Sequence, residues 1–211
     1  MEDFRSPQYS LKLTSLTADK KYQEFLKVVG PRGATARLRL GWTPLIIFAA
    51  QGGSSADPSK IQVVDQLLAW STDIHAFDQD GHNVLSNAIC ARNNMLVVHL
   101  IKRGANMRSK IGTNQLTAIQ YAGCYEATGD KIPICEILML RGAKPDEFKV
   151  NDMLNENVEK FYARIVSSRR TTTCLLGVRN RSPLLKLVGK DIMLQLAKAI
   201  YQTRGGKVWE Q

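Results

Sequence analysis

Apolar side chains recur along the centre of the chain in two alternating patterns. One pattern is a short apolar run that ends in alanine, and its copies begin at Gly41, Gly81 and Gln115. The other pattern places valine, leucine and isoleucine three and four residues apart, and its copies end at Ser71, Gly104 and Gly142. This spacing is typical of amphipathic helices. It predicts paired antiparallel helices within Thr43–Leu68, Asn83–Lys102 and Thr117–Leu140.

Local signals predict where these helices begin and end. Thr43 suits a helix N-cap, and Pro44 suits the first turn, where no amide donor is needed. Leu45, Phe48 and Ala49 are then expected on one face of the first helix. Gly104 and Gly142 follow the second helices, where a left-handed glycine commonly ends a helix.

The two patterns together resemble the ankyrin repeat, roughly G-x-T-P-L-H-x-A-A followed by V-V-x-x-L-L-x-x-G-A-D. The matching segments include Gly41–Ala49 and Val97–Asn106. Gly81 and Gln115 are 34 residues apart, close to the ankyrin period of about 33. Extra residues at 52–58 and 126–130 are expected between the two helices of a repeat. The resemblance covers residues 38–148 and implies an all-α solenoid of three repeats.

The two ends of the chain depart from this pattern. Residues 1–37 are expected to form an N-terminal arm and a capping helix. The arm is expected to be extended over residues 1–16, and the helix to span about 19–29. A turn is expected to follow at Gly30-Pro31-Arg32-Gly33. Residues 149–211 are expected to form a basic C-terminal helical extension. The sequence therefore predicts three parts, at 1–37, 38–148 and 149–211.

Positive charge is concentrated in the C-terminal extension. The chain has a formal net charge of +10, and from residue 161 onward ten basic residues face two acidic ones, so this quarter carries +8 of that charge. Such a patch attracts acidic protein, RNA or anionic lipid, and a solvated helix face is the alternative interpretation. The candidate basic patch is Arg164, Arg169, Arg170, Arg179 and Arg181.

The segment Leu184–Ile192 resembles the F-box-like or SOCS-box segments that follow ankyrin repeats in some ubiquitin-ligase adaptors. The resemblance is to the line L-x-x-L-P-x-[DE]-I. Val188 and Gly189 stand where the proline is expected, which is a departure from that line. A helical pair that caps the last repeat is the alternative interpretation of this tail.

The residue types that carry chemistry predict no enzyme, cofactor or metal site. The positions of His75, His82 and His99 within the repeats explain them without catalysis, and Asp78 and Asp80 belong to a predicted hairpin. The four cysteines lack the spacing of a zinc framework and are expected to be reduced and buried. The chain has no apolar run long enough for a transmembrane segment and no secretory signal at its start, so an intracellular, cytoplasmic protein is expected, with nuclear and organellar locations open.

These observations predict a non-catalytic scaffold that binds a protein partner, as a binding or assembly subunit of a larger complex. A ubiquitin-ligase substrate adaptor and a ribosome- or RNA-associated structural protein are the alternatives. The ankyrin resemblance implies partner contacts on first helices and hairpin tips. The candidate residues are Phe77, Asp78, Asn87, Arg108, Lys110, Tyr121 and Tyr125.

Overall fold

A computed structural model describes residues 3–51, 57–126 and 133–143 of the chain. Within these ranges the chain is all-α, as the sequence predicts, with two isolated β-bridges and no strand. A short 3-10 turn spans Arg39–Gly41. The eight α-helices are α1 Pro7–Ala18, α2 Tyr22–Ala34, α3 Pro44–Gln51, α4 Pro58–Ala69, α5 Val84–Cys90, α6 Asn94–Lys102, α7 Ala118–Glu126 and α8 Pro133–Leu140.

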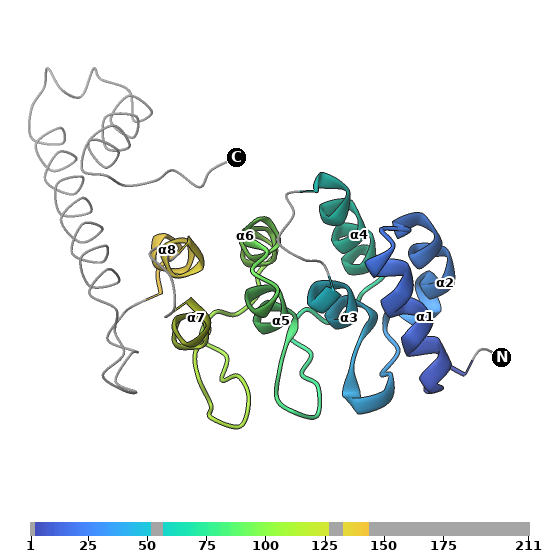
Figure 1. The fold of residues 1–211 in the computed structure, drawn as a ribbon, viewed down its shortest axis with the longest axis horizontal. Coiled ribbons are helices and arrows are strands. Elements are labelled where there is room, and N and C mark those ends of the chain that lie inside the picture. The colour runs from blue at the N-terminus through green and yellow to red at the C-terminus, as the bar shows by residue number, and fades with distance from the viewer. Residues whose placement is uncertain (1–2, 52–56, 127–132, 144–211) are drawn as a thin grey trace, which may run out of the picture.

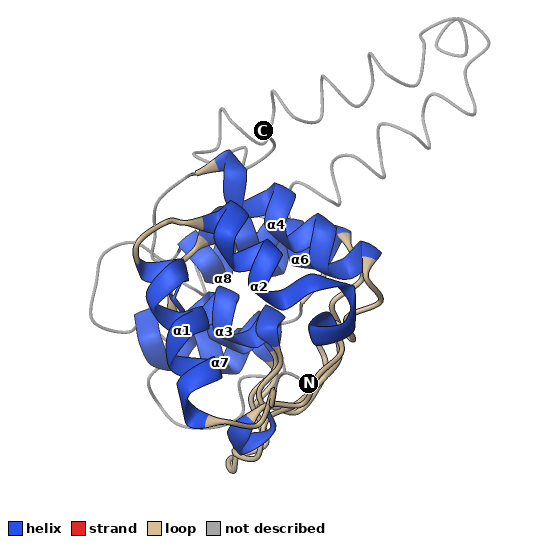
Figure 2. Cartoon of the chain, turned by 90° about the vertical axis from the view of Figure 1, so that its right-hand side faces the viewer, coloured by secondary structure: helices blue, strands red, loops and turns tan. Residues whose placement is uncertain are grey.

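The helices lie in two rows (Figure 1). In one row α3 packs between α1 and α5, and α5 also contacts α7; in the other, α4 packs between α2 and α6, and α6 also contacts α8. Each helix also packs on its partner in the other row, so α3–α4, α5–α6 and α7–α8 are the three predicted pairs. The loops that join one pair to the next all project on one side, where Figure 2 shows them gathered.

The predicted helix starts are confirmed where side chains cap the backbone. The Ile46 amide donates to Thr43 Oγ1 at 3.2 Å, and Pro44 is the first residue of α3. The next pair begins with a reciprocal capping box. There the Ser86 amide donates to Asn83 Oδ1 and the Asn83 amide donates to Ser86 Oγ, both at 2.9 Å. Gly104 and Gly142 follow α6 and α8 with φ of +96° and +106°, as predicted for left-handed helix ends.

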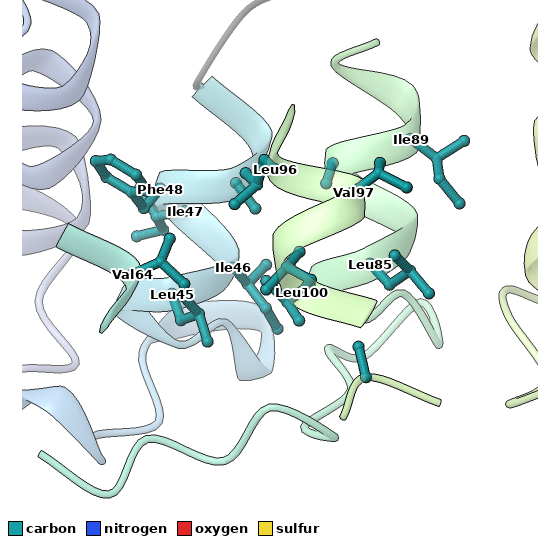
Figure 3. Packing of buried hydrophobic residues seen from close by; sticks show 14 of the residues in the cluster. Leu45, Ile46, Ile47, Phe48, Val64, Leu85, Ile89, Leu96, Val97 and Leu100 are labelled. Atoms are coloured by element: carbon teal, nitrogen blue, oxygen red, sulfur yellow. The ribbon is translucent and has the colours of Figure 1, made fainter. Parts of the chain in front are cut away.

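The core is continuous along the two rows, and α3 is buried on every side. None of the residues from Leu45 to Ala49 is more than 1% exposed, so the single apolar face predicted for this helix is too narrow. The reason is that α3 is enclosed by α1, α2, α4 and α5. Figure 3 shows Leu85 and Ile89 from α5 and Leu96, Val97 and Leu100 from α6 in the same core.

The extended arm predicted for residues 1–16 is wrong, because most of this segment is helix α1. Ser6 caps the helix by accepting a hydrogen bond from the Tyr9 amide at 3.2 Å, and Pro7 occupies the first turn. The helix buries Tyr9, Leu13 and Leu16. These three residues are four and three positions apart, which is helical spacing, so the sequence does carry a signal for α1 that the prediction of an extended arm overlooked.

The turn predicted at Gly30–Gly33 is a kink within α2. Gly30 has φ of +56° and ψ of 173°, outside the helical region, and the helix continues to Ala34 with Pro31 directly after the kink. Gly33 and Ala34 are buried. The turn of helix after this kink packs beside the start of the chain, since a Cβ added at Gly33 would meet Tyr9 Oη at 3.0 Å and the Phe4 ring at 3.1 Å.

The extra residues predicted at 52–58 and 126–130 fall between the helices of a pair, as expected, except that Pro58 begins α4 and Glu126 ends α7. No helix within the described ranges is long and apolar enough to cross a membrane. The predicted C-terminal extension, residues 149–211, lies outside the described residues.

Candidate functional site

Three loops, at 35–43, 70–83 and 103–117, form what is called here the hairpin edge. The last two each close with a β-bridge, Phe77 with Asn83 and Ile111 with Leu116. In the first loop the Leu38 amide donates to the Trp42 carbonyl at 2.8 Å. The side chains on this edge therefore stand on closed, ordered turns.

Successive hairpins are joined by backbone hydrogen bonds. The Gln79 amide donates to the Leu40 carbonyl at 2.9 Å, and the Gly112 amide donates to the Gly81 carbonyl at 2.8 Å. Gly81 has φ of +76°, and a Cβ added there would meet the Gly112 nitrogen at 3.3 Å. A side chain at Gly81 would thus strain the backbone and crowd the neighbouring hairpin. These contacts fix the spacing of the three hairpins.

Phe77 and Asp78, predicted as neighbouring partner contacts, have different surroundings. Phe77 is 38% exposed, one of three large apolar residues that are exposed within the described ranges. The Asp78 side chain is only 3% exposed. Its Oδ1 accepts hydrogen bonds from the amides of Asp80 at 3.0 Å and His82 at 2.8 Å. Asp78 therefore holds the turn together, while Phe77 is presented to solvent.

Asn87 and Tyr121 are also engaged within the molecule. Asn87 Nδ2 donates to the Asn83 carbonyl at 2.9 Å, which ties it to the start of α5. Tyr121 is 8% exposed; its Oη lies 3.0 Å from Cys90 Sγ, and its ring lies 5.8 Å from that of His82. The Tyr125 side chain lies outside the described part of the chain.

Arg108 and Lys110 are exposed on the third hairpin, as the resemblance implies. The Arg108 amide donates to Asn106 Oδ1 at 2.9 Å, so the turn beneath its side chain is fixed. The structure thus places Phe77, Arg108 and Lys110 on one edge and leaves their side chains exposed. The basic patch at Arg164, Arg169, Arg170, Arg179 and Arg181 lies outside the described residues.

A second feature of the edge was missed in the sequence, namely an open hollow of about 440 Å³ at its N-terminal end. It combines three arginines with apolar and polar side chains. The lining residues are Arg5, Arg37, Leu38, Arg39, Leu40, Gly41 and Gln79. The alternation of basic and apolar residues over 37–40 was the available signal. This alternation alone does not predict a hollow, because two of the lining residues, Arg5 and Gln79, are far from residues 37–40 in the sequence.

His82 and the two nearby acids, Asp78 and Asp80, belong to one turn of the second hairpin. His82 Nδ1 lies 3.9 Å from Asp78 Oδ1, and ligand atoms of Asp78, Asp80 and His82 lie within 4.8 Å of one another. Because Asp78 Oδ1 already accepts two backbone hydrogen bonds, turn formation explains this cluster. The His75 amide donates to Asp73 Oδ1 at 2.8 Å in the same loop.

The cysteines differ in exposure. Cys135 is buried, as expected, but Cys90 is exposed, because it lies at the end of α5.

An ion cluster links the other row of helices. Asp65 Oδ1 on α4 accepts hydrogen bonds from His99 Nε2 at 2.6 Å and from Arg103 Nε at 2.9 Å. Arg103 Nη2 forms an ion pair with the same oxygen at 2.8 Å. Partial burial would by itself raise the pKa of the Asp65 carboxyl, but the hydrogen bonds from Arg103 and His99 outweigh it and hold this pKa below its ordinary value of 3.8. The cluster therefore joins α4 to α6 while Asp65 is ionised.

Asp65→Asn is expected to lower the free energy of unfolding by about 0.5–1 kcal/mol near pH 5, the range of a partly exposed ion cluster. The folded protein has the lower Asp65 pKa, so this stabilisation is complete above the unfolded pKa and is lost as the pH falls through the folded one. The deficit of the variant should shrink below about pH 3.8. Urea unfolding of both proteins across this pH range measures it.

Asp80→Asn, at an exposed position on the second hairpin, controls for the loss of one carboxylate. A deficit of Asp65→Asn that stays constant as the pH falls would contradict the proposed ionic origin.

A further group of polar residues lies at the start of α4, where this helix packs on α2. Asp57 caps α4 by accepting from the Ser59 amide at 3.0 Å and from the Ser59 hydroxyl. These hydrogen bonds lower the pKa of the Asp57 carboxyl. Burial lowers the pKa of the nearby Lys60 ammonium, an effect that Asp57 partly offsets. These shifts follow from helix capping and burial at the α2–α4 contact.

No protein-family model matches the sequence, and no curated protein matches it.

Proposed function

We propose that the chain is an ankyrin-type helical solenoid that binds a partner protein through its hairpin edge and catalyses no reaction. The observation that carries the proposal is the backbone pairing of successive hairpins, from Gln79 to Leu40 and from Gly112 to Gly81. This pairing supports a binding role because it holds side chains from separate hairpins in fixed relative positions. A preorganised surface loses little conformational entropy when a partner binds.

The row-by-row packing of helices supports the ankyrin assignment. The pair α1–α2 packs on α3–α4 through α1·α3 and α2·α4 contacts, as α3–α4 packs on α5–α6. Each pair buries its apolar surface against its neighbours, which is the physical basis of a solenoid. In this proposal α1 and α2 form a complete first helix pair. The predicted boundary at residue 38 separates this pair from the three repeats whose sequences are more similar to the ankyrin pattern.

The contacts of the histidines support a non-catalytic role. His99 is held in the ion cluster with Asp65, and His82 packs near the Tyr121 ring. A nucleophile and base within hydrogen-bonding distance would be the signature of covalent catalysis. Cys90 Sγ instead lies 3.0 Å from Tyr121 Oη. The exposed Cys90 thiol also fits a reducing, cytoplasmic location, which is part of the proposal.

Partner binding is expected to depend on Phe77, Arg108 and Lys110, because these are exposed on the edge. The triple variant F77S/R108Q/K110Q should reduce recovery of a co-purified partner at least about tenfold, since aromatic and arginine side chains carry much of the energy of protein interfaces. Affinity purification of the tagged full-length chain, followed by mass spectrometry and measurement of complex stoichiometry, tests this expectation.

The matched control is L11S/K12Q/K27Q, which removes one exposed apolar side chain and two exposed lysines from α1 and α2. It should leave recovery of the partner unchanged. A stable partner whose recovery falls equally in both variants would contradict binding at the hairpin edge.

The alternative functions depend on residues 149–211. Recovery of a cullin or its linker protein that requires residues 182–204 would favour the ubiquitin-ligase adaptor. The charge of +8 after residue 160 favours the ribosome- or RNA-associated alternative. RNA binding through the basic patch would weaken steeply from low to moderate salt. RNA binding unchanged over that range would exclude this patch as the RNA surface.

A further inference from the structure

The hollow at the N-terminal end of the hairpin edge brings cationic groups from two segments together. Arg5 precedes α1, while Arg37 and Arg39 belong to the first hairpin. Gln79 reaches the same hollow from the second hairpin. Because the lining comes from three places in the sequence, the hollow exists only when the first two hairpins are docked.

The three arginines have different roles. Arg37 Nη1 donates to the carbonyls of Gly41 at 3.2 Å and Phe77 at 2.8 Å, and so ties the two hairpins together. The guanidinium groups of Arg5 and Arg39 form no ion pair with any residue in the described ranges. These two groups are therefore available to an external anion.

An exposed apolar side chain, that of Leu40, borders the same cationic surface. Only three large apolar side chains are exposed within the described ranges, and two of them, Leu40 at 50% and Phe77 at 38%, belong to the first two hairpins. Leu40 lines the hollow, and the Phe77 carbonyl accepts the hydrogen bond from Arg37. Exposed apolar surface beside free guanidinium groups is typical of protein interfaces, where arginine and aromatic residues are enriched.

We propose that this hollow binds an acidic segment of a partner protein in which an aliphatic or aromatic residue is flanked by carboxylates. Arg5 and Arg39 pair with the carboxylates through the planar fork that matches their geometry. The apolar residue lies against Leu40. The inference rests on the proposed function and specifies the chemistry of the partner. A nucleic-acid backbone would satisfy the arginines but would leave the aliphatic Leu40 without a matching group.

Fluorescence anisotropy with the full-length chain tests this inference. The probe is a labelled nine-residue peptide, Gly-Glu-Glu-Leu-Glu-Phe-Glu-Glu-Gly. One control peptide replaces every glutamate by glutamine, and another replaces leucine and phenylalanine by serine. Each control peptide should bind at least about tenfold more weakly, because each removes one of the two complementary features. Equal binding of the serine peptide would overturn the apolar part of the inference.

The protein variants locate the binding. R5Q/R39Q should weaken binding of the probe at least about tenfold, and L40N about fivefold, while the charge-matched control K12Q/K27Q should stay within about twofold. Asparagine suits position 40 because Leu40 has φ of +59°, a region that asparagine tolerates. Circular dichroism and thermal unfolding verify that each variant is folded. Binding unchanged in both R5Q/R39Q and L40N would place the peptide elsewhere, such as on the basic residues after 160, and overturn the inference.

An oligothymidylate with the same negative charge as the peptide tests whether the hollow binds nucleic acid instead of an acidic peptide. It should bind R5Q/R39Q and the wild type alike, since its binding is expected at other cationic sites. Oligothymidylate binding that depends on Arg5 and Arg39 but not on Leu40 would overturn the peptide inference in favour of nucleic acid. Failure of the peptide to bind, with a co-purified partner still lost in F77S/R108Q/K110Q, would remove this inference and leave the proposed function standing.

Discussion

Phe48→Ala is expected to lower the free energy of unfolding by about 3–5 kcal/mol, the cost of removing a fully buried phenylalanine from a packed core. Phe48 has no exposed surface and lies on α3. Its ring centroid is 5.5 Å from that of Tyr22 and 5.4 Å from that of Phe25, both on α2. The substitution would therefore open a cavity where α2 and α3 meet. Urea or thermal unfolding, followed by circular dichroism, measures the effect.

Phe77→Ala provides the matched control, because Phe77 is 38% exposed on the hairpin edge. Its effect on the free energy of unfolding should stay within about 0.5 kcal/mol, as for other surface substitutions. A loss below about 1 kcal/mol for Phe48→Ala would contradict the aromatic core, since cavity formation in a packed interior costs more.

Leu13→Ala is expected to cost about 2–5 kcal/mol of the free energy of unfolding. Leu13 lies on α1 and has no exposed surface. It belongs to the core that α1 shares with α2 and α3, so its loss would weaken the packing of the first helix pair. The same unfolding measurement on the full-length chain tests this expectation.

Leu11→Ala removes the same side chain from the same helix at a position that is 68% exposed. It should change the free energy of unfolding by no more than about 0.5 kcal/mol. An extended arm over residues 1–16 would make both substitutions equally mild. Equal small effects would therefore contradict the helical first pair and restore that interpretation.

The candidate site was only partly predictable. The ankyrin resemblance selected the hairpins, and on them Phe77, Arg108 and Lys110 are exposed. It also selected Asp78 and Tyr121, whose polar atoms are satisfied inside the molecule. A turn aspartate that binds its own backbone and one that faces a partner occupy the same sequence position. The difference depends on side-chain orientation, which periodicity does not specify.

Local sequence signals were enough to predict the helical class, the three central helix pairs and their boundaries at residues such as Thr43, Asn83 and Gly104. These features follow from local rules, because capping, proline and glycine geometry and apolar spacing act within a few residues. The burial of α3 on all sides and the hollow shared by Arg5, Arg37 and Gln79 became visible only in the folded chain. Burial and proximity depend on which distant segments pack together, and that is set by the stacking of helix pairs and the docking of one hairpin on the next.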